Sequence, residues 1–264
     1  MEVIVNINNL EYSYNDKNNI FNNLCMYIQK NSITAISGPN NSGKSTILKL
    51  LSTNKYNKKG SIIIDAKDIV EYSKKEYDKL VQAVFPNNSI FKQPKVIDEL
   101  YINQEEIDEE KTNFLIENLN LTKILNKDIN TLSRQDKYRL LISKAILNTN
   151  SIVLLDSLDE YFNNNEIKEL YTFFRKCIEK YDLTFIITIN NLINSIETDY
   201  LFIINQGGTI LYGEPLKVLD KDNIINKAGL EIPFMIDLSV KLKDYNLLNN
   251  IELNKERLIN TLWK

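Results

Sequence analysis

The sequence predicts an α/β fold, and three observations support this prediction. Short apolar, β-branched segments alternate with segments whose apolar residues recur at helical spacing, which is typical of a parallel sheet covered by helices. One of these strands, at 33–37, leads directly into a turn bounded by glycines and then into a helix at 44–51. Several strand-like segments precede this turn, so we expect a β-rich N-terminal subdomain.

The expected elements follow this alternation along the chain. The segments predicted to be strands are 2–10, 12–14, 24–28, 33–37, 60–65, 80–85, 151–156, 184–189, 200–204 and 209–213. The segments predicted to be helices are 44–51, 73–78, 105–126, 135–147, 166–181, 237–242 and 255–263. We therefore expect a main domain at 1–220, with a helical insert near 90–145, and a small helical region at 221–264.

The turn after the strand at 33–37 fits the phosphate-loop pattern GxxxxGK[ST]. It consists of Gly38, Pro39, Asn40, Asn41, Ser42, Gly43, Lys44, Ser45 and Thr46. Amides in such a loop and the N-terminus of the next helix direct partial positive charge at one small volume, where a polyphosphate binds. Lys44 would add a full charge beside the β- and γ-phosphates, and the Ser45 hydroxyl is the expected Mg²⁺ ligand. The alternative is a chance match in a tight turn, which the flanking strand and helix argue against.

Composition excludes several classes of function. No apolar run of about 18 residues is present, so we expect no membrane-spanning helix. The absence of histidine excludes histidine-based zinc sites and Ser-His or Cys-His nucleophile pairs. A net charge of −3 without a basic block argues against nucleic acid as a partner. Two isolated cysteines, Cys25 and Cys177, favour reduced thiols in a cytoplasmic protein.

The chain contains only 7 glycines and is rich in asparagine and lysine, which indicates a compositional bias. Asn41 occupies a loop position where glycine is common, and asparagine tolerates positive φ better than other non-glycine residues.

The apolar strand at 151–156 ends in the carboxylate of Asp156. In a parallel sheet covered by helices, ligands bind at the carboxyl ends of the strands. We therefore expect Asp156 to face the phosphates, and a helix cap is the alternative role.

With these features in this order, the chain resembles the ATP-binding subunits of ABC transporters over nearly its whole length. Three tail segments, 212–219, 228–234 and 258–263, are similar to the ATPases of energy-coupling-factor importers of the cobalt and vitamin type. The resemblance implies a P-loop NTPase fold, namely the ABC nucleotide-binding domain, and the cofactors ATP and Mg²⁺. It also implies that the helical region at 221–264 helps subunits dimerise.

Carried over position by position, the resemblance assigns further roles. Tyr14 matches the aromatic residue that stacks on adenine, and a tyrosine at a strand edge is the alternative. Ser133 matches the serine of the signature motif. Ser45 and Asp156 match the residues that hold Mg²⁺, the latter through water.

Four other family motifs are altered. Pro86 stands in place of the glutamine that follows the same strand, and proline can neither ligate Mg²⁺ nor position water. Arg134 and Gln135 replace the signature glycines, Ser157 replaces the catalytic glutamate, and Asn190 replaces the switch histidine. Loss of a positioned general base costs about 10²- to 10⁴-fold in rate, so hydrolysis should be impaired while binding is retained.

The resemblance implies an ATP-binding subunit of an energy-coupling-factor importer, peripheral on the cytoplasmic face of the membrane. The implied partners are a second ATPase subunit, in a heterodimer rather than a homodimer, an integral membrane coupling subunit, and a membrane component that binds substrate. A non-hydrolysing regulatory or structural module is the alternative function. A third possibility is an active ATPase that uses Asp159 or Glu160, just beyond Asp156.

Overall fold

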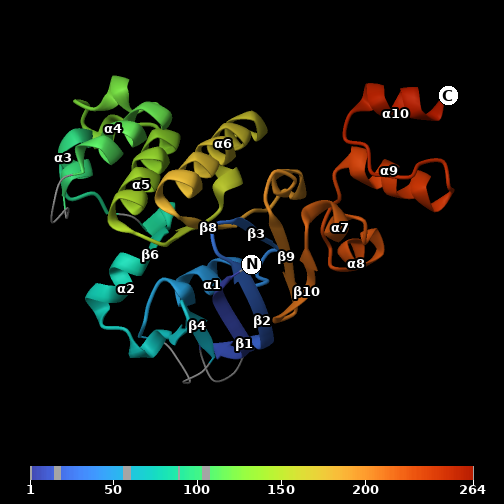
Figure 1. The fold of residues 1–264 in the computed structure, drawn as a ribbon, viewed down its shortest axis with the longest axis horizontal. Helices are drawn as coiled ribbons and strands as arrows, with labels where there is room; N and C mark the ends of the chain where they lie inside the picture. The colour runs from blue at the N-terminus through green and yellow to red at the C-terminus, as the bar shows by residue number, and fades with distance from the viewer. Residues whose placement is uncertain (1, 15–18, 56–60, 89, 103–107, 264) are drawn as a thin grey trace.

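The computed structural model describes residues 2–14, 19–55, 61–88, 90–102 and 108–263. These residues form two β-sheets with helices around them, which confirms the predicted α/β fold (Figure 1).

The larger sheet has six strands in the order β10-β9-β3-β8-β7-β6. Its strands are β3 (Ile33–Ser37), β6 (Val81–Val84), β7 (Ile152–Leu155), β8 (Thr184–Thr188), β9 (Tyr200–Asn205) and β10 (Gly208–Gly213). All neighbouring pairs from β9 to β6 are parallel, and β10 adds an antiparallel edge. Because the central parallel strands β3, β7 and β8 are buried on both faces, their residues are buried without alternation.

The smaller sheet is antiparallel and has the order β2-β1-β4-β5. Its strands are β1 (Val3–Ser13), β2 (Asn19–Gln29), β4 (Ile62–Ile64) and β5 (Lys67–Asp68). Helix α1 (Lys44–Leu51) buries Ile47, Leu48, Leu50 and Leu51 in the cluster that joins the two sheets. These are the four positions that the sequence predicts to be apolar on one helical face.

Helices cover the opposite face of the large sheet, where a second apolar cluster lies (Figure 1). They are α3 (Val96–Tyr101), α4 (Glu109–Asn118), α5 (Arg134–Asn148) and α6 (Asn164–Tyr181), while α2 (Lys74–Leu80) precedes β6. Short 3-10 turns are η1 (Ile69–Glu71), η2 (Pro86–Asn88), η3 (Thr122–Ile124), η4 (Ile129–Thr131), η5 (Leu158–Glu160) and η6 (Leu192–Ser195). The buried Glu99 carboxylate pairs with Lys144 and accepts the amides of Lys92 and Gln93, so it ties α3 to α5.

The C-terminal helices lie beyond the β9–β10 edge (Figure 1). They are α7 (Pro215–Leu219), α8 (Asp222–Lys227), α9 (Phe234–Asp244) and α10 (Lys255–Leu262). Ile236 and Val240 of α9 join the cluster that covers the large sheet, whereas Phe234, Tyr245 and Trp263 are exposed.

Most predicted strands and helices are confirmed, and the differences have local causes. The predicted strands at 2–10 and 12–14 form one strand, β1, and Tyr14 follows its end. The predicted helix at 105–126 is wrong in extent, because Asn120 adopts a left-handed φ of 57° shortly after α4. Residues 105–107 and Gly60 of the predicted strand at 60–65 lie outside the described residues. Helices α3, α7 and α8 were not predicted because each is only one or two turns long.

Candidate nucleotide site

Four neighbouring parallel strands end at the same edge of the large sheet. They are β3, β8, β7 and β6, whose last residues are Ser37, Thr188, Leu155 and Val84. The phosphate-loop sequence connects β3 to α1, so it lies at this edge. The loops after β6, β7 and β8 carry the other predicted site residues, Pro86, Asp156, Ser157 and Asn190.

The loop requires glycine at both ends. A Cβ at Gly38 would lie 2.3 Å from the carbonyl oxygen of Ile204, and a Cβ at Gly43 would lie 2.6 Å from the Phe21 ring. Gly43 also has φ of +102°, a conformation that strains any other residue. Asn41 adopts φ of 63°, the left-handed conformation that its position predicts.

Lys44 folds back over the loop. Its Nζ donates hydrogen bonds to the carbonyl oxygens of Gly38, at 2.7 Å, and Pro39, at 3.2 Å. Burial lowers the pKa of the Lys44 ammonium, and the nearby carboxylates of Asp159, Asp156 and Glu160 oppose this shift. The loop therefore holds a positive charge at the N-terminus of α1, where an anion is stabilised.

Asp156 lies at the centre of a network of hydroxyl groups. Its Oδ1 accepts hydrogen bonds from Ser45 Oγ, at 3.0 Å, and from Thr188 Oγ1, at 2.7 Å. Thr188 Oγ1 in turn accepts the amide of Ser157, at 2.7 Å. Thr188 was not predicted as a site residue. The pairing of β8 with β7 places this threonine, at the end of an apolar strand, beside Asp156.

The hydroxyl of Ser45 and the carboxylate of Asp156 fit a magnesium ion. Both are hard oxygen donors, and they already lie within hydrogen-bond distance of each other. In the described part of the chain, no group of three His, Cys, Asp or Glu side chains could hold a metal ion. Magnesium bound here would therefore take most of its ligands from water and phosphate oxygens, as it prefers.

The loop also has capacity for further hydrogen bonds. The Oγ atoms of Ser42 and Ser37 are buried without a hydrogen-bond partner among the residues that the structure describes. Such orphaned hydroxyls are uncommon unless a ligand or water completes them.

Tyr14 lies beside the start of α1. Its hydroxyl is 3.4 Å from Thr46 Oγ1, and its ring meets Tyr12 edge-on at a centroid distance of 5.2 Å. The side chain is 57% exposed, so an aromatic face is accessible next to the phosphate loop.

The loops after β7 and β8 are bonded to each other. Asp159 Oδ2 accepts the amides of Asn190, at 2.8 Å, and Asn191, at 2.7 Å. Glu160 Oε1 accepts Asn190 Nδ2, at 3.2 Å. Ser157 adopts a left-handed conformation with φ of 53°. The side chain of Asn190, the residue predicted to replace the switch histidine, is therefore engaged by a carboxylate.

The loop after β6 is tied to the same region. Pro86 begins η2, and Asn87 Oδ1 in this turn accepts the hydroxyl of Tyr161, at 3.0 Å. A pyrrolidine ring at Pro86 offers no group that could bind an ion or a water molecule.

The residues that the resemblance matches to the signature motif form the start of α5. Ser133 is the N-cap, whose Oγ accepts the amide of Asp136 at 3.0 Å and donates to its carboxylate at 2.8 Å. Gln135 Nε2 donates to Glu166 Oε1 at 2.8 Å. Hydrogen bonds connect the predicted site residues around the phosphate loop, joining Tyr14 to Thr46 and Ser45 to Asp156. Ser133 instead bonds to Asp136 in the first turn of its own helix.

Comparison with known proteins identifies relatives along nearly the entire chain. The model of the ABC transporter family matches residues 21–159. An energy-coupling factor transporter ATP-binding protein, EcfA, of Malacoplasma penetrans is 25% identical over 265 residues, which cover 98% of this chain and 92% of the relative. The EcfA1 protein of Mesomycoplasma hyopneumoniae is 27% identical over 263 residues, covering 96% and 94%.

Among solved structures, cbiO1 from Clostridium perfringens, described as part of the ABC transporter complex cbiONQ, has the same fold. It superposes with a TM-score of 0.72 at 23% sequence identity, and the match covers 90% of this chain and 99% of that one. In the described residues, no helix is long and apolar enough to cross a membrane.

Proposed function

Because the chain belongs to the ABC transporter family, we propose that it is the ATP-binding subunit of an energy-coupling-factor importer that holds MgATP but hydrolyses it poorly. The homologous energy-coupling-factor ATP-binding subunits support the role of a transporter ATPase. Uptake of a vitamin or metal ion would be powered or gated together with a second ATPase subunit and membrane subunits.

One contrast supports retained binding and impaired hydrolysis. The groups that would hold a nucleotide are held in place, since Lys44 donates to the carbonyl oxygen of Gly38 and Ser45 donates to Asp156. Around the expected γ-phosphate position, the family's histidine after β8 and glutamate after β7 are replaced by Asn190 and Ser157. ATP would bind through the phosphate loop, with Mg²⁺ between Ser45 and Asp156 and adenine against Tyr14.

Asp159 and Glu160 are the nearby carboxylates that could replace the missing base. Asp159 Oδ2 already accepts two backbone amides, and Glu160 bonds to Asn190. These contacts favour a role in ordering the loop after β8.

A heterodimer fits these substitutions better than a homodimer. In this family two subunits enclose two nucleotides, and each site combines the phosphate loop of one chain with the signature of the other. A homodimer would repeat every altered residue in both sites, whereas an intact partner would restore some of them. The exposed Phe234 and Trp263 near the C-terminus are candidates for contacts in the dimerisation region at 221–264.

Equilibrium ATP binding and phosphate release by the purified chain test this function. We expect Mg²⁺-dependent binding with turnover at least about 100-fold below that of an intact relative, from the loss of a general base. Rapid turnover by the chain alone would contradict impaired hydrolysis. Co-purification with an intact ATPase and a membrane subunit would distinguish transport from a regulatory module that uses ATP only to set its conformation.

A further inference from the structure

The first turn of α1 offers amide donors to the inner phosphates of a nucleotide. The amide of Ile47 donates to the carbonyl oxygen of Gly43 at 2.9 Å, so the helical bonding begins there. The amides of Lys44, Ser45 and Thr46 precede it, and amides at the start of a helix have no acceptor within the helix. They lie where a phosphate loop holds the β-phosphate of a nucleotide.

The donors of the loop after β8 are instead used by carboxylates of the protein. The amides of Asn190 and Asn191 both donate to Asp159 Oδ2, at 2.8 Å and 2.7 Å. The side-chain amide of Asn190 donates to Glu160 Oε1 at 3.2 Å. Hydrogen bonds from amides to a carboxylate are stronger than those between neutral groups, so an incoming phosphate would have to compete for these donors.

The carboxylates that take these donors also lie close to Lys44. Burial lowers the pKa of the Lys44 ammonium, and among the carboxylates that oppose this shift Asp159 has the largest effect. Asp159 Oδ1 is buried and has no hydrogen-bond partner among the residues that the structure describes. Magnesium bound between Ser45 and Asp156 would offset the charge of Asp156, which leaves the charges of Asp159 and Glu160 beside one ammonium group.

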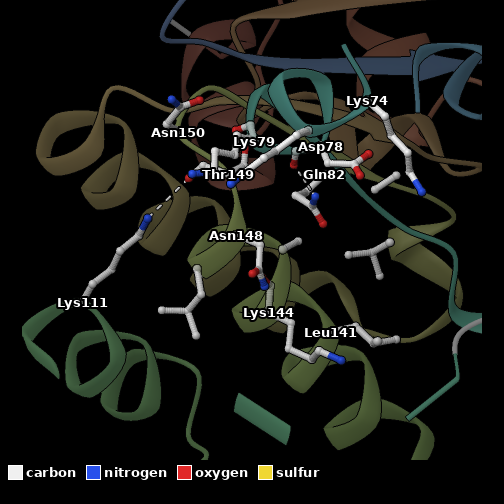
Figure 2. A pocket seen from close by; sticks show the side chains of 15 residues that line it. Lys74, Asp78, Lys79, Gln82, Lys111, Leu141, Lys144, Asn148, Thr149 and Asn150 are labelled. Atoms are coloured by element: carbon white, nitrogen blue, oxygen red, sulfur yellow. Dashed lines mark hydrogen bonds between the residues drawn. The ribbon is translucent and has the colours of Figure 1, made fainter. Parts of the chain in front are cut away.

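Other lysines gather in a different part of the fold. A cavity between α2, β6 and α5 is lined by five lysines and one aspartate (Figure 2), and the lysines are Lys74, Lys75, Lys79, Lys111 and Lys144. None of the residues that line it belongs to the phosphate loop or to the loops after β7 and β8. These ammonium groups attract anions to the cavity. An experiment on the nucleotide site must therefore exclude binding of nucleotide there.

The terminal phosphate of a triphosphate would meet fixed negative charge. Its expected position lies between Lys44 and the loops after β7 and β8, whereas a diphosphate ends near the first turn of α1. Like charges in a partly buried site repel each other more strongly than they do in water. The contacts of Asp159 with two amides hold its carboxylate in place, so it cannot move away from the phosphate without losing them.

We propose that Asp159 and Glu160 determine which nucleotide the site prefers, and that they favour a nucleoside diphosphate over the triphosphate. This inference rests on the proposed function and adds a specificity to the same site. MgATP still binds through the phosphate loop, but its γ-phosphate adds no affinity. Specificity of this kind comes from unfavourable contacts with one ligand and not from extra contacts with the other.

Calorimetric titration of the complete chain with ADP and with ATP, both in excess Mg²⁺, tests the inference. The wild type should bind ADP at least as tightly as ATP. The variant Asp159→Asn with Glu160→Gln keeps the side-chain oxygens and removes both charges, so it should bind ATP at least about tenfold more tightly and ADP less than about threefold more tightly. Tighter binding of ATP than of ADP by the wild type would overturn the inference.

Two matched variants control for general effects of charge. Glu169→Gln with Asp244→Asn removes two exposed carboxylates from α6 and α9, and should leave the ratio of the two dissociation constants unchanged. Lys74→Ala with Lys75→Ala and Lys79→Ala removes three lysines of the cavity in Figure 2, and should leave both affinities unchanged. A large loss of ATP binding in this lysine variant would place the nucleotide in the cavity and overturn the inference.

The melting temperature of each variant separates specificity from folding. If the double variant is less stable, Glu160→Gln alone, at an exposed side chain, should still shift the ratio toward ATP by at least about threefold. If both nucleotides bind and the ratio is the same in every folded variant, the inference is wrong and the proposed function stands. If the wild type binds neither nucleotide, the proposed function is wrong and the inference falls with it.

Discussion

The phosphate loop and the loop after β7 lie at the same edge of the sheet, but they depend on the sequence in different ways. The phosphate loop is shaped by backbone geometry, since Gly38 and Gly43 approach their neighbours too closely for a Cβ. The loop after β7 would act in catalysis through the side chain at one position, which is Ser157 in this chain. The phosphate loop therefore tolerates substitutions between its two glycines, such as asparagine at position 41, whereas a site built from one carboxylate is lost with one substitution.

The largest expected effect is on the affinity of the phosphate loop for ATP. Lys44→Ala should weaken ATP binding by about 3 kcal/mol, roughly 100-fold, because it removes a charged donor to the phosphates. Isothermal titration calorimetry measures this change, and Lys168→Ala on the exposed part of α6 is the matched control. Equal affinity of the two variants would show that the loop does not hold the nucleotide.

The second effect concerns the catalytic side chains that the loops after β7 and β8 lack. Ser157→Glu combined with Asn190→His should raise ATP turnover in the assembled complex by at least about tenfold. The wild-type serine already adopts a left-handed backbone with φ of 53°, so the glutamate adds a carboxylate at this position without a new kind of backbone strain. Phosphate release measures it.

The isosteric variant Ser157→Gln with Asn190→His is the control for this experiment. It has the same size but no carboxylate, so its turnover should match that of the wild type. Equal turnover of the glutamate and glutamine variants would contradict the account of lost catalysis.

A smaller effect tests the assignment of magnesium. Ser45→Ala removes the hydroxyl that lies 3.0 Å from Asp156 Oδ1. The variant should bind MgATP about 5- to 10-fold more weakly, equivalent to one hydrogen bond or ligand of about 1 kcal/mol. ATP binding in EDTA should be unchanged, and a loss of equal size with and without magnesium would exclude this role.

The smallest effect concerns the scaffold beneath both loops. Cys177 is buried on α6, and burial raises the pKa of its thiol from 9.0 to about 12. Since the folded pKa is the higher one, its contribution to stability is complete below pH 9 and is lost as the pH rises from 9 toward 12. At about pH 10 the loss should be about 1 kcal/mol.

Urea unfolding of the wild type and Cys177→Ala at about pH 8 and about pH 10 measures this contribution as a difference. Both proteins contain the same other titrating groups, including the tyrosines with raised pKa. The difference in unfolding free energy between the two proteins therefore removes the contributions of these groups. An identical pH dependence of the two proteins would mean that the thiol titrates with its ordinary pKa when folded.

The sequence predicts the binding loop well because its determinants are local. Strand, loop and helix are adjacent in the chain, and all four predicted apolar positions of α1 are buried. The network around Asp156 was only partly predictable, because Thr188 approaches it through strand pairing between residues 32 positions apart. The cavity between α2, β6 and α5 was not predicted at all, since its lining residues come from segments that span positions 74 to 150.

The contacts between the loops of the site also lie beyond local patterns. Asp159 and Glu160 are ordinary loop carboxylates in the sequence, yet they contact the loop after β8 through Asn190 and Asn191. Such contacts depend on the order of strands in the sheet, which alternation of strand and helix alone does not determine.

The use of asparagine at left-handed positions has a practical consequence for engineering. Asn9, Asn31, Asn41, Asn120 and Asn246 all have φ between 49° and 63°. Because asparagine tolerates this conformation, and because glycine gives the unfolded chain greater freedom, a glycine at each position should change the free energy of unfolding by less than about 1 kcal/mol. An asparagine-rich chain can therefore form these turns without glycine and keep a less flexible unfolded state.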